Sequence, residues 1–433
     1  MLDKTKAIHL IGIGGVGMSA LAELLVTLGY KVTGSERFLD SGKRLPVLVA
    51  LESQGIVLFP QTGEGIDPAT TGAIVASTAI ESTNPDIAAA NRFGIPILHR
   101  SEALAQCLEN HKLIAIAGTC GKSTTTAMVG HLLAEVGLSP LVVNGAAVVN
   151  WRSETRTGAV FSGSGEYAVA EVDESDKSLM NFHPALAVIT NCSADHFCLL
   201  ETNIKKLFDA FKKQVKDKVI DGRVEQIPEI TEGEWSVEFD YKGNHFLVPL
   251  PGKHNGENAY WAVRVAETLG IPLEKAATAL KTFGGVARRL ELVGTKDGAR
   301  IIDEYAHNTE KLRASIMTMQ ARAKRVLVLW RPHGYAPLKK MFSALEEMFA
   351  ETLRPSDALY LLPVFDAGGT TSRTIQSDEL AAALTQHGVN VEYVLTHEEA
   401  FNKISPQLAQ GVYVGVFGAR DPELTETANR LCH

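Results

Sequence analysis

The stretch KLIAIAGTCGKSTTTAMVGHLLAEVG, residues 112–137, joins a short apolar run to an amphipathic run through a small loop. The apolar run has the length and composition of a buried strand, and the run after the loop has the spacing of a helix. Between them, the backbone N–H groups of Gly121, Lys122 and Ser123 would point at an anion, and the helix N-terminus adds about half a positive charge. The stretch predicts a strand–loop–helix phosphate site in an α/β fold.

The loop carries two side chains suited to a bound nucleotide. Lys122 can reach the β- and γ-phosphates, and the Ser123 hydroxyl can ligate Mg²⁺. The strict form of the pattern has a glycine where Ile116 stands, so the alternative is a glycine turn with a coincidental lysine. The strand, the helix and the run of hydroxyl residues together favour the nucleotide site.

Short apolar runs alternate with longer amphipathic runs along most of the 433 residues, which is typical of βαβ units and parallel sheets. A chain of this length exceeds one hydrophobic core. We expect three α/β domains: a Rossmann-like domain at 1–109, a central P-loop mononucleotide-binding domain at 110–294 and a Rossmann-like domain at 295–433. In the central domain, EWSVEFDYKGNHFLVPLP (234–251) alternates around Lys-Gly-Asn and predicts a β-hairpin.

Composition narrows the class of protein. The net charge of −8 and the isoelectric point near 5.9 argue against sequence-independent binding to nucleic acid. No apolar run approaches the roughly 20 residues that span a bilayer, and no signal-peptide cleavage site follows the N-terminal apolar run. Five scattered cysteines without a CxxC pair suit a reducing compartment. We expect a cytoplasmic enzyme without membrane insertion, as a monomer or a homodimer.

Acidic residues follow two further apolar runs. YAVAEVDESDKS places Glu171, Asp173, Glu174 and Asp176 at the end of a buried-looking strand, and LAVITNCSADHF ends on Asp195 and His196. The carboxyl ends of strands in an open α/β sheet face the ligand crevice, so these groups could hold Mg²⁺. Because Mg²⁺ prefers oxygen ligands, an Asp-His pair taken alone could equally be a capped turn.

Six segments occur in the order and approximate spacing of the Mur ligase family, which the whole chain resembles: AGTCGKSTTT, AEVDESD, NCSADH, PGKHNGENAYWAV, GVARRLE and DEYAH. Members of that family are ATP-dependent amide ligases of peptidoglycan precursor synthesis. The resemblance implies that ATP phosphorylates the carboxylate of a UDP-N-acetylmuramate-like substrate, and that an amine then attacks the acyl phosphate. GIGGVGMSALAELL is most similar to the branch that adds L-alanine, and the branch that attaches a recycled tripeptide is a near relative.

The resemblance also implies roles for individual residues. Lys122, His196 and His307 would be catalytic, and Mg²⁺ would be held by Ser123, Glu171 and His196. The expected ATP contacts are Gly118, Thr119, Cys120, Gly121, Lys122, Ser123, Thr124, Asn255, Asn258, Arg289 and Glu304. Three of these residues have an ordinary alternative, because Asn255 could cap its helix, Arg289 could form a solvated pair with Arg288, and His307 could be a turn histidine.

A second glycine loop, GIGGVG, lies between the apolar run AIHLI and a helical run. Taken alone it fits a dinucleotide site, with Glu36 as the acid that binds the ribose. The resemblance instead implies that the loop binds the diphosphate of the UDP-sugar, through Gly12, Gly14, Gly15, Val16 and Gly17. Ser35, Ser77 and Thr78 would lie on the uridine side. The expected ligands are therefore ATP with Mg²⁺, a UDP-sugar, and an amino acid or peptide.

The sequence departs from the family pattern at several positions. Glu304 stands where an aspartate usually holds the ribose, and Cys198 stands where an aspartate is usual. The segment RPHGYAP stands where the L-alanine branch has an arginine-bearing PHRY segment that faces the amino acid. Gly334 and Pro337 cannot bind a carboxylate through their side chains, which leaves Arg331 as the alternative. These departures leave two alternatives open: a ligase that uses another amine or carboxylate, and a nucleotide-binding homologue with impaired catalysis.

Overall fold

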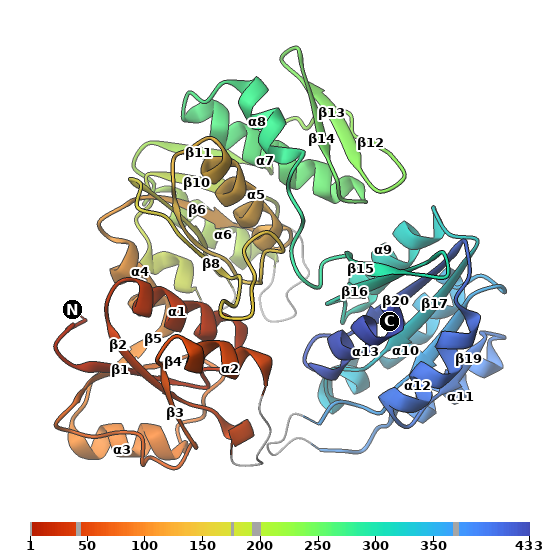
Figure 1. Cartoon of the computed structure of the whole chain (residues 1–433), viewed down its shortest axis with the longest axis horizontal. Coiled ribbons are helices and arrows are strands. Elements are labelled where there is room, and N and C mark those ends of the chain that lie inside the picture. Colours follow the sequence, from red (N-terminus) through yellow and green to blue (C-terminus); the bar gives the residue numbers. More distant parts are fainter. Residues whose placement is uncertain (1, 40–44, 175–176, 193–200, 367–371) are drawn as a thin grey trace. The chain divides into compact units, whose positions relative to one another are not determined.

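The computed structural model describes residues 2–39, 45–174, 177–192, 201–366 and 372–433. The chain divides into two compact units, Met1–Val286 and Ala287–His433, each with its own sheets and its own buried core (Figure 1). Within the described ranges, no helix combines the length and the apolar character that crossing a lipid bilayer requires.

The first sheet is parallel and has five strands in the order β3-β2-β1-β4-β5. Its strands are β1 (Ala7–Ile11), β2 (Lys31–Ser35), β3 (Val57–Phe59), β4 (Thr71–Ala76) and β5 (Ile97–His99). The α-helices that connect them or follow them are α1 (Val16–Thr27), α2 (Pro46–Ser53), α3 (Pro85–Phe93) and α4 (Arg100–Leu108). The strand order reverses between β1 and β4, and a ligand crevice is expected at the carboxyl ends of such a pair.

The second sheet also belongs to the first unit and has six strands in the order β11-β10-β6-β9-β7-β8. Its strands are β6 (Lys112–Ala117), β7 (Leu141–Val143), β8 (Val160–Ser162), β9 (Tyr167–Glu171), β10 (Leu186–Ile189) and β11 (Lys218–Asp221). The α-helices of this part are α5 (Lys122–Glu135), α6 (Glu201–Lys212), α7 (Lys253–Thr268) and α8 (Leu273–Leu280). Only β8 runs antiparallel to its neighbour, so the phosphate loop after β6 lies at the carboxyl end of a parallel sheet.

The predicted hairpin is confirmed. Strands β13 (Val237–Tyr241) and β14 (Asn244–Val248) pair in antiparallel register around Lys242 and Gly243. Both turn residues have a left-handed backbone, with φ of 48° and 77°, as the tight turns that suit the twist of a hairpin require. A short third strand, β12 (Thr231–Glu232), extends this sheet and was not predicted.

The second unit contains a six-stranded sheet in the order β15-β16-β20-β17-β18-β19. Its strands are β15 (Glu291–Lys296), β16 (Ala299–Glu304), β17 (Arg325–Trp330), β18 (Ala358–Leu361), β19 (Val391–Tyr393) and β20 (Val412–Phe417). Its α-helices are α9 (Thr309–Gln320), α10 (Tyr335–Thr352), α11 (Ser377–Gln386), α12 (His397–Ile404) and α13 (Glu423–Cys432). All strands except β15 are parallel to their neighbours, which confirms the predicted α/β class with parallel sheets.

One buried cluster runs from the first sheet into the second. It contains Leu10 of β1, Leu108 of α4 and Ala115 of β6, so the predicted boundary between residues 109 and 110 lies inside a continuous core. The other predicted boundary, between residues 294 and 295, falls within β15. The proposed limits of the three domains therefore stay predictions, although the three largely parallel sheets themselves are clear.

Candidate active site: two glycine loops and a histidine pair

The loop between β6 and α5 needs glycine at two positions. Gly118 has a φ of 133° and Gly121 a φ of 81°, which residues with a Cβ rarely adopt. A Cβ on Gly118 would lie 2.0 Å from the Thr190 hydroxyl oxygen, and one on Gly121 would lie 2.3 Å from the Asn258 amide oxygen. The loop is thus shaped by glycine conformation and by close packing, and its N–H groups precede the N-terminus of α5.

Two residues that the sequence analysis did not single out hold this loop from β10. The Asn191 Oδ1 accepts hydrogen bonds from the Thr119 hydroxyl at 2.7 Å and from the Cys120 N–H at 2.9 Å. The Cys120 carbonyl accepts from the Thr190 hydroxyl at 2.6 Å and from the Asn191 amide at 3.0 Å. The side chain of Asn191 therefore fixes both polar groups of the Cys120 backbone.

Lys122 at the start of α5 lies between a carbonyl and a carboxylate. Its Nζ donates to the Gly118 carbonyl at 2.7 Å and to both oxygens of the buried Glu174, at 2.8 and 3.0 Å. Burial opposes the charge on Lys122, but the neighbouring carboxylates, Glu174 first among them, outweigh it and raise the pKa of the lysine. Lys122 is consequently a positively charged side chain held in place where the loop meets α5.

Oxygen atoms suited to a divalent cation lie beside Lys122. The Ser123 hydroxyl donates to the Glu171 carboxylate at 2.8 Å, and the Gly145 N–H donates to the same oxygen at 3.0 Å. A hydroxyl and a carboxylate are the hard oxygen donors that Mg²⁺ takes in nucleotide sites. The third predicted metal ligand, His196, and the departure at Cys198 lie outside the described residues.

The predicted adenine contacts, Asn255 and Asn258, lie on the first turns of α7 and are buried. The Asn255 amide donates to the Pro251 carbonyl at 2.7 Å, and Gly252 occupies the N-cap position, so Asn255 does not cap its own helix. The Asn258 Oδ1 accepts from the Thr125 hydroxyl at 3.2 Å. Asn258 therefore lies against the phosphate loop, beside Thr124 and Thr125 in the first turn of α5.

The first glycine loop follows β1, and its exposed Val16 begins α1. Gly12 has a φ of 68°, and the Gly14 N–H donates to a carboxylate oxygen of Glu36 at 3.0 Å. A Cβ on Gly17 would lie 3.1 Å from a guanidinium nitrogen of Arg100, which begins α4 after β5. The loop thus has an anion on one side and a cation on the other, and the sequence analysis missed Arg100.

The three residues predicted on the uridine side differ in accessibility. Ser35 is fully buried and its hydroxyl donates to the buried Asp86, so the geometry weighs against direct ligand contact by Ser35. Ser77 is half-buried and Thr78 exposed, and both follow β4 at the edge where β1 also ends. Ser77 and Thr78 are hence beside the first loop, at the reversal of strand order.

In the second unit, the segment before β15 has an unusual backbone. Arg288 and Leu290 have φ values of 58° and 47°, a conformation that costs energy in residues with a Cβ. The N–H of Arg288 donates to Glu291 at 3.0 Å, and that of Leu290 donates to Glu304 at 2.7 Å. Glu304 is buried, which raises the pKa of its carboxyl, and its position favours a structural contact over ribose binding.

Arg288 and Arg289 do not form a solvated pair. Arg288 is half-buried and donates to Asp303 at 3.2 Å and to the Gly418 carbonyl. Arg289 lies over the ring of Tyr305, with its guanidinium carbon 5.1 Å from the ring centre. Arg289 thereby faces the segment that follows β16.

His307 lies in that segment and meets a second histidine. Its ring centre is 4.9 Å from that of His333, in an edge-to-face arrangement, and its Nδ1 lies 3.0 Å from the Tyr305 carbonyl. Burial lowers the pKa of each imidazole to about 4, helped by nearby positive charge that includes Arg420. Both rings are therefore neutral near pH 7.

Three side chains that could hold a metal ion lie together in the described part of the second unit: His397, Asp421 and Glu423. Arg331 already donates to Asp421 at 2.6 Å, and the His397 ring nitrogen is 2.8 Å from the same carboxylate oxygen. Since a guanidinium already neutralises this carboxylate, we assign no metal there. Arg331 also donates to the Pro363 carbonyl, so its guanidinium is not available to bind the carboxylate of an amino acid in place of the side chains that Gly334 and Pro337 lack.

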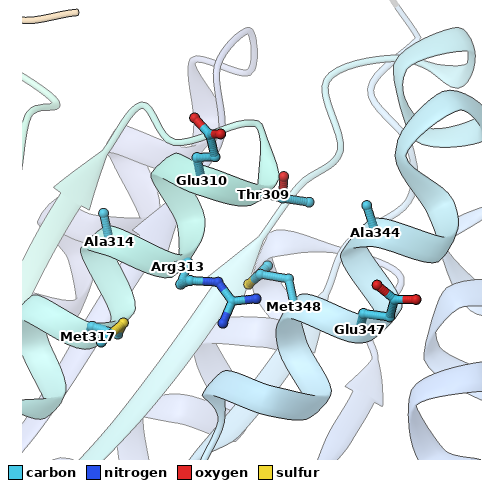
Figure 2. A pocket seen from close by; sticks show the side chains of 8 residues that line it. All are labelled: Thr309, Glu310, Arg313, Ala314, Met317, Ala344, Glu347 and Met348. Carbon is cyan, nitrogen blue, oxygen red and sulfur yellow. The ribbon is translucent and has the colours of Figure 1, made fainter. Parts of the chain in front are cut away.

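A groove of about 470 Å³ lies elsewhere on the second unit, between α9 and α10 (Figure 2). Its lining residues are Thr309, Glu310, Arg313, Ala314, Met317, Ala344, Glu347 and Met348. None of the predicted site residues is among them. Within each unit, the predicted site residues of the described ranges lie at strand ends, in loops and at the starts of helices, away from this groove.

The phosphate loop and the three largely parallel sheets define an α/β protein of the P-loop nucleotide-binding class. Three family models match successive parts of the chain: "Mur ligase family, catalytic domain" at residues 7–112, "Mur ligase middle domain" at 116–227 and "Mur ligase, glutamate ligase domain" at 288–420. The chain belongs to the Mur ligase family. It is accordingly an ATP-dependent, ADP-forming ligase of the Mur type.

Two relatives illustrate the similarity in sequence. A UDP-N-acetylmuramate–L-alanine ligase of Carboxydothermus hydrogenoformans is 31% identical over 451 residues, covering 96% of this chain and 94% of the relative. The enzyme of the same name from Paracoccus denitrificans is 34% identical over 432 residues, with 88% and 86% covered.

Solved structures agree on the fold. The UDP-N-acetylmuramate–alanine ligase of Thermotoga maritima superposes with a TM-score of 0.82 at 23% identity, and 98% of each chain is covered. A murein peptide ligase from Psychrobacter arcticus gives a TM-score of 0.67 at 19% identity, with 99% and 98% covered. The three-domain α/β architecture predicted from the sequence is confirmed.

Proposed function

We propose that the protein joins L-alanine to the carboxylate of UDP-N-acetylmuramate, with hydrolysis of ATP to ADP and phosphate. The names of the relatives that cover nearly the whole chain support this pair of substrates. The observation that carries the proposal is the group around Lys122, in which a cation, a hydroxyl and a carboxylate lie within hydrogen-bonding distance of a phosphate loop.

In the first step, a substrate carboxylate oxygen attacks the γ-phosphorus of ATP, and ADP leaves. Lys122 would neutralise charge that builds up on the transferring phosphoryl group, and the loop N–H groups would position it. Ser123 and Glu171 would hold Mg²⁺, which supplies further charge neutralisation when it is bound. Gly118, Thr119, Cys120, Gly121 and Thr124 would complete the phosphate site, with Asn255 and Asn258 toward the base.

In the second step, the amine nitrogen attacks the carbonyl carbon of the acyl phosphate, an amide bond forms and inorganic phosphate leaves. His307, which is neutral near pH 7, would accept a hydrogen bond from the attacking amine, and the departing phosphate would take the proton that the amine loses. Arg289 would lie on the phosphate side. We place the reaction in the cytoplasm, since the four cysteines in the described part of the chain (Cys107, Cys120, Cys192 and Cys432) form no disulfide, which suits a reducing compartment.

The UDP-substrate would bind on the first glycine loop. The N–H groups of Gly12, Gly14, Gly15, Val16 and Gly17 precede or begin α1, which favours an anion. Arg100 would add a cation to the diphosphate, and Ser77 and Thr78 would approach the uridine. Ser35 would stabilise this edge of the first sheet through the hydrogen bond that its hydroxyl donates to Asp86.

A specific observation favours a second candidate function, a ligase of the same type that uses another amine such as a peptide. Gly334 has no side chain, and Arg331 is tied to Asp421, so neither can bind the carboxylate of the amino acid as an arginine at position 334 would. The amine is therefore the substrate that most needs a direct test.

The test is ADP release and product mass from purified protein with MgATP, UDP-N-acetylmuramate and a panel of amines that includes L-alanine and a recycled tripeptide. We expect ADP release and the mass of the L-alanine amide. Product with the tripeptide alone would favour the second candidate. No amine-dependent ADP release with any combination would refute both and favour an impaired homologue.

Replacement of Lys122 by Ala should lower turnover by roughly 100-fold or more, since it removes the cation at the transferring phosphate. Lys112→Ala is the matched control, because Lys112 is an exposed lysine at the start of β6, the strand that leads into the loop. Thermal unfolding of both variants would separate loss of catalysis from loss of folding. Near-normal turnover of folded Lys122→Ala would contradict the assignment.

A further inference from the structure

The carboxyl ends of three neighbouring strands meet in the second unit. Glu304 at the end of β16 pairs with Phe417 of β20, and Phe417 pairs with Trp330 of β17. The segments that follow these strands carry His307, Arg420 and His333. In a parallel sheet this edge is where a ligand is expected.

The arginines at this edge differ in whether their charge is already balanced. Arg288 donates to Asp303, and Arg331 donates to Asp421. Arg420, the residue before Asp421, is exposed, and no hydrogen bond or ion pair joins it to any residue in the described part of the chain. Within the described residues, the guanidinium of Arg420 is thus unpaired, whereas those of Arg288 and Arg331 already face carboxylates.

Two neutral rings lie within electrostatic range of this cation. The positive charge of Arg420 acts on both His307 and His333 and disfavours their protonation. The two rings are in contact with each other, and their centres are 4.9 Å apart. A neutral imidazole can accept a hydrogen bond from an amine, whereas a guanidinium can bind a carboxylate through two parallel hydrogen bonds. Together they complement the two ends of an amino acid.

We propose that Arg420 binds the carboxylate of the incoming amino acid and so determines which amine the ligase accepts. The inference rests on the proposed function, because it names the residue that holds the amine substrate. It also accounts for Gly334 and Pro337, since an arginine from the end of β20 would supply the charge that the start of α10 lacks. The guanidinium forms no covalent bond in this role and acts only in binding.

The experiment compares wild type, Arg420→Ala and Arg420→Lys with L-alanine and with L-alaninamide, which lacks the carboxylate. In Arg420→Ala, the KM for L-alanine should rise by between roughly 10- and 100-fold, the effect of losing charge-assisted hydrogen bonds. The KM values for ATP and UDP-N-acetylmuramate should change less than about twofold. Arg420→Lys should recover part of the loss, because lysine keeps the charge but not the paired geometry.

Arg430→Ala is the matched control, since Arg430 lies on α13 and pairs with Glu398 at the surface. It should leave all KM values unchanged. If Arg420→Ala raises the KM for L-alaninamide as much as the KM for L-alanine, Arg420 does not bind the carboxylate and the inference is overturned. An equal rise in the KM for ATP would overturn it as well.

A binding measurement separates this result from failure of the proposed function. L-alanine should shift the NMR signals of the His307 and His333 rings in wild type, and neither L-alaninamide in wild type nor L-alanine in Arg420→Ala should do so. Absence of turnover together with this shift would refute the proposed reaction but keep the carboxylate site. Turnover together with equal NMR shifts from L-alanine and L-alaninamide would support the proposed reaction but refute the carboxylate site.

Discussion

Arg100 supplies a cation that the first glycine loop itself lacks. The side chain comes from the start of α4, far along the sequence from the loop, and its guanidinium lies against Gly17. In the described residues it has no ion-pair partner, so its charge is available to a bound anion. A diphosphate at the N-terminus of α1 would meet both the helix and this guanidinium.

Replacement of Arg100 by Ala should weaken binding of UDP more than binding of uridine. We expect a loss of roughly 10-fold for UDP and little change for uridine, because the guanidinium acts on phosphate and not on the base. Isothermal titration with the two ligands measures the difference. Arg92→Ala is a suitable control, since Arg92 lies over Phe93 on α3. An equal loss for both ligands would show that Arg100 acts on the fold instead.

Residues within contiguous motifs could be predicted from the sequence, whereas their partners could not. Strand, glycine loop and helix follow one another along the chain, so Lys122 and Ser123 were placed correctly at the start of α5. Asn191, which follows β10, and Arg100, which begins α4, reach the loops from distant parts of the sequence. Nothing in their local sequence predicts these contacts. Ser35 shows the opposite problem, because the family resemblance implied a place on the uridine side, although this last residue of β2 is buried against Asp86.

Strand β1 brings a titratable group into the core of the first sheet. His9 is fully buried, its Nδ1 lies 3.0 Å from the Thr33 hydroxyl, and its Nε2 has no hydrogen-bond partner in the described residues. Burial lowers the pKa of His9 to about 4, although the charge of Asp86 opposes the shift. The strand is consequently sensitive to acid.

The free energy of unfolding should fall as the pH decreases from about 6.5 toward 4. The unfolded chain, in which a histidine has its ordinary pKa of about 6.5, takes up a proton that folded His9 resists, and the effect levels off below pH 4. The loss due to His9 should reach about 3 kcal/mol. Urea unfolding of wild type and His9→Gln over this range would measure it.

The variant should have a flatter pH dependence than wild type, whatever its stability at pH 7.5. The exposed His387 serves as control, and His387→Gln should follow the wild-type profile. Identical slopes for wild type and His9→Gln would mean that folding does not lower the pKa of His9.

At the level of elements, long amphipathic helices and buried parallel strands were predictable because their periodicity is strong. The hairpin was predictable because its turn residues adopt the left-handed backbone that Gly favours. Strand β15 was missed, and a domain boundary was placed inside it, because an antiparallel strand at a sheet edge depends on its partner β16 and not on its own sequence.

The whole molecule consists of two units joined once along the chain, between Val286 and Ala287. The core of the second unit contains only residues from that unit, and its sheet is complete without strands from the first. The first unit contains both glycine loops. Each unit therefore meets the requirements of an independently folding body.

Expressed separately, residues 287–433 should fold and unfold cooperatively, and residues 1–286 should bind UDP and a MgATP analogue. Neither fragment alone should release ADP in the presence of amine, since the arginine and histidine groups of the second unit would be missing from the first. Circular dichroism, ligand titration and the ADP assay test these three statements. An unfolded 287–433 fragment would show that its stability depends on the first unit.

The carboxylates around the two glycine loops have a consequence for how ligands enter. Glu36 accepts from Gly14, Glu174 binds Lys122, and Glu171 binds Ser123 and Gly145, so in this structure the chain contributes its own counter-ions. Each loop then works as an ion exchanger, in which an arriving phosphate replaces a carboxylate that is tethered to the protein. The exchange at the second loop leaves two glutamates to be neutralised, and a divalent cation that arrives with the nucleotide restores the balance of charge.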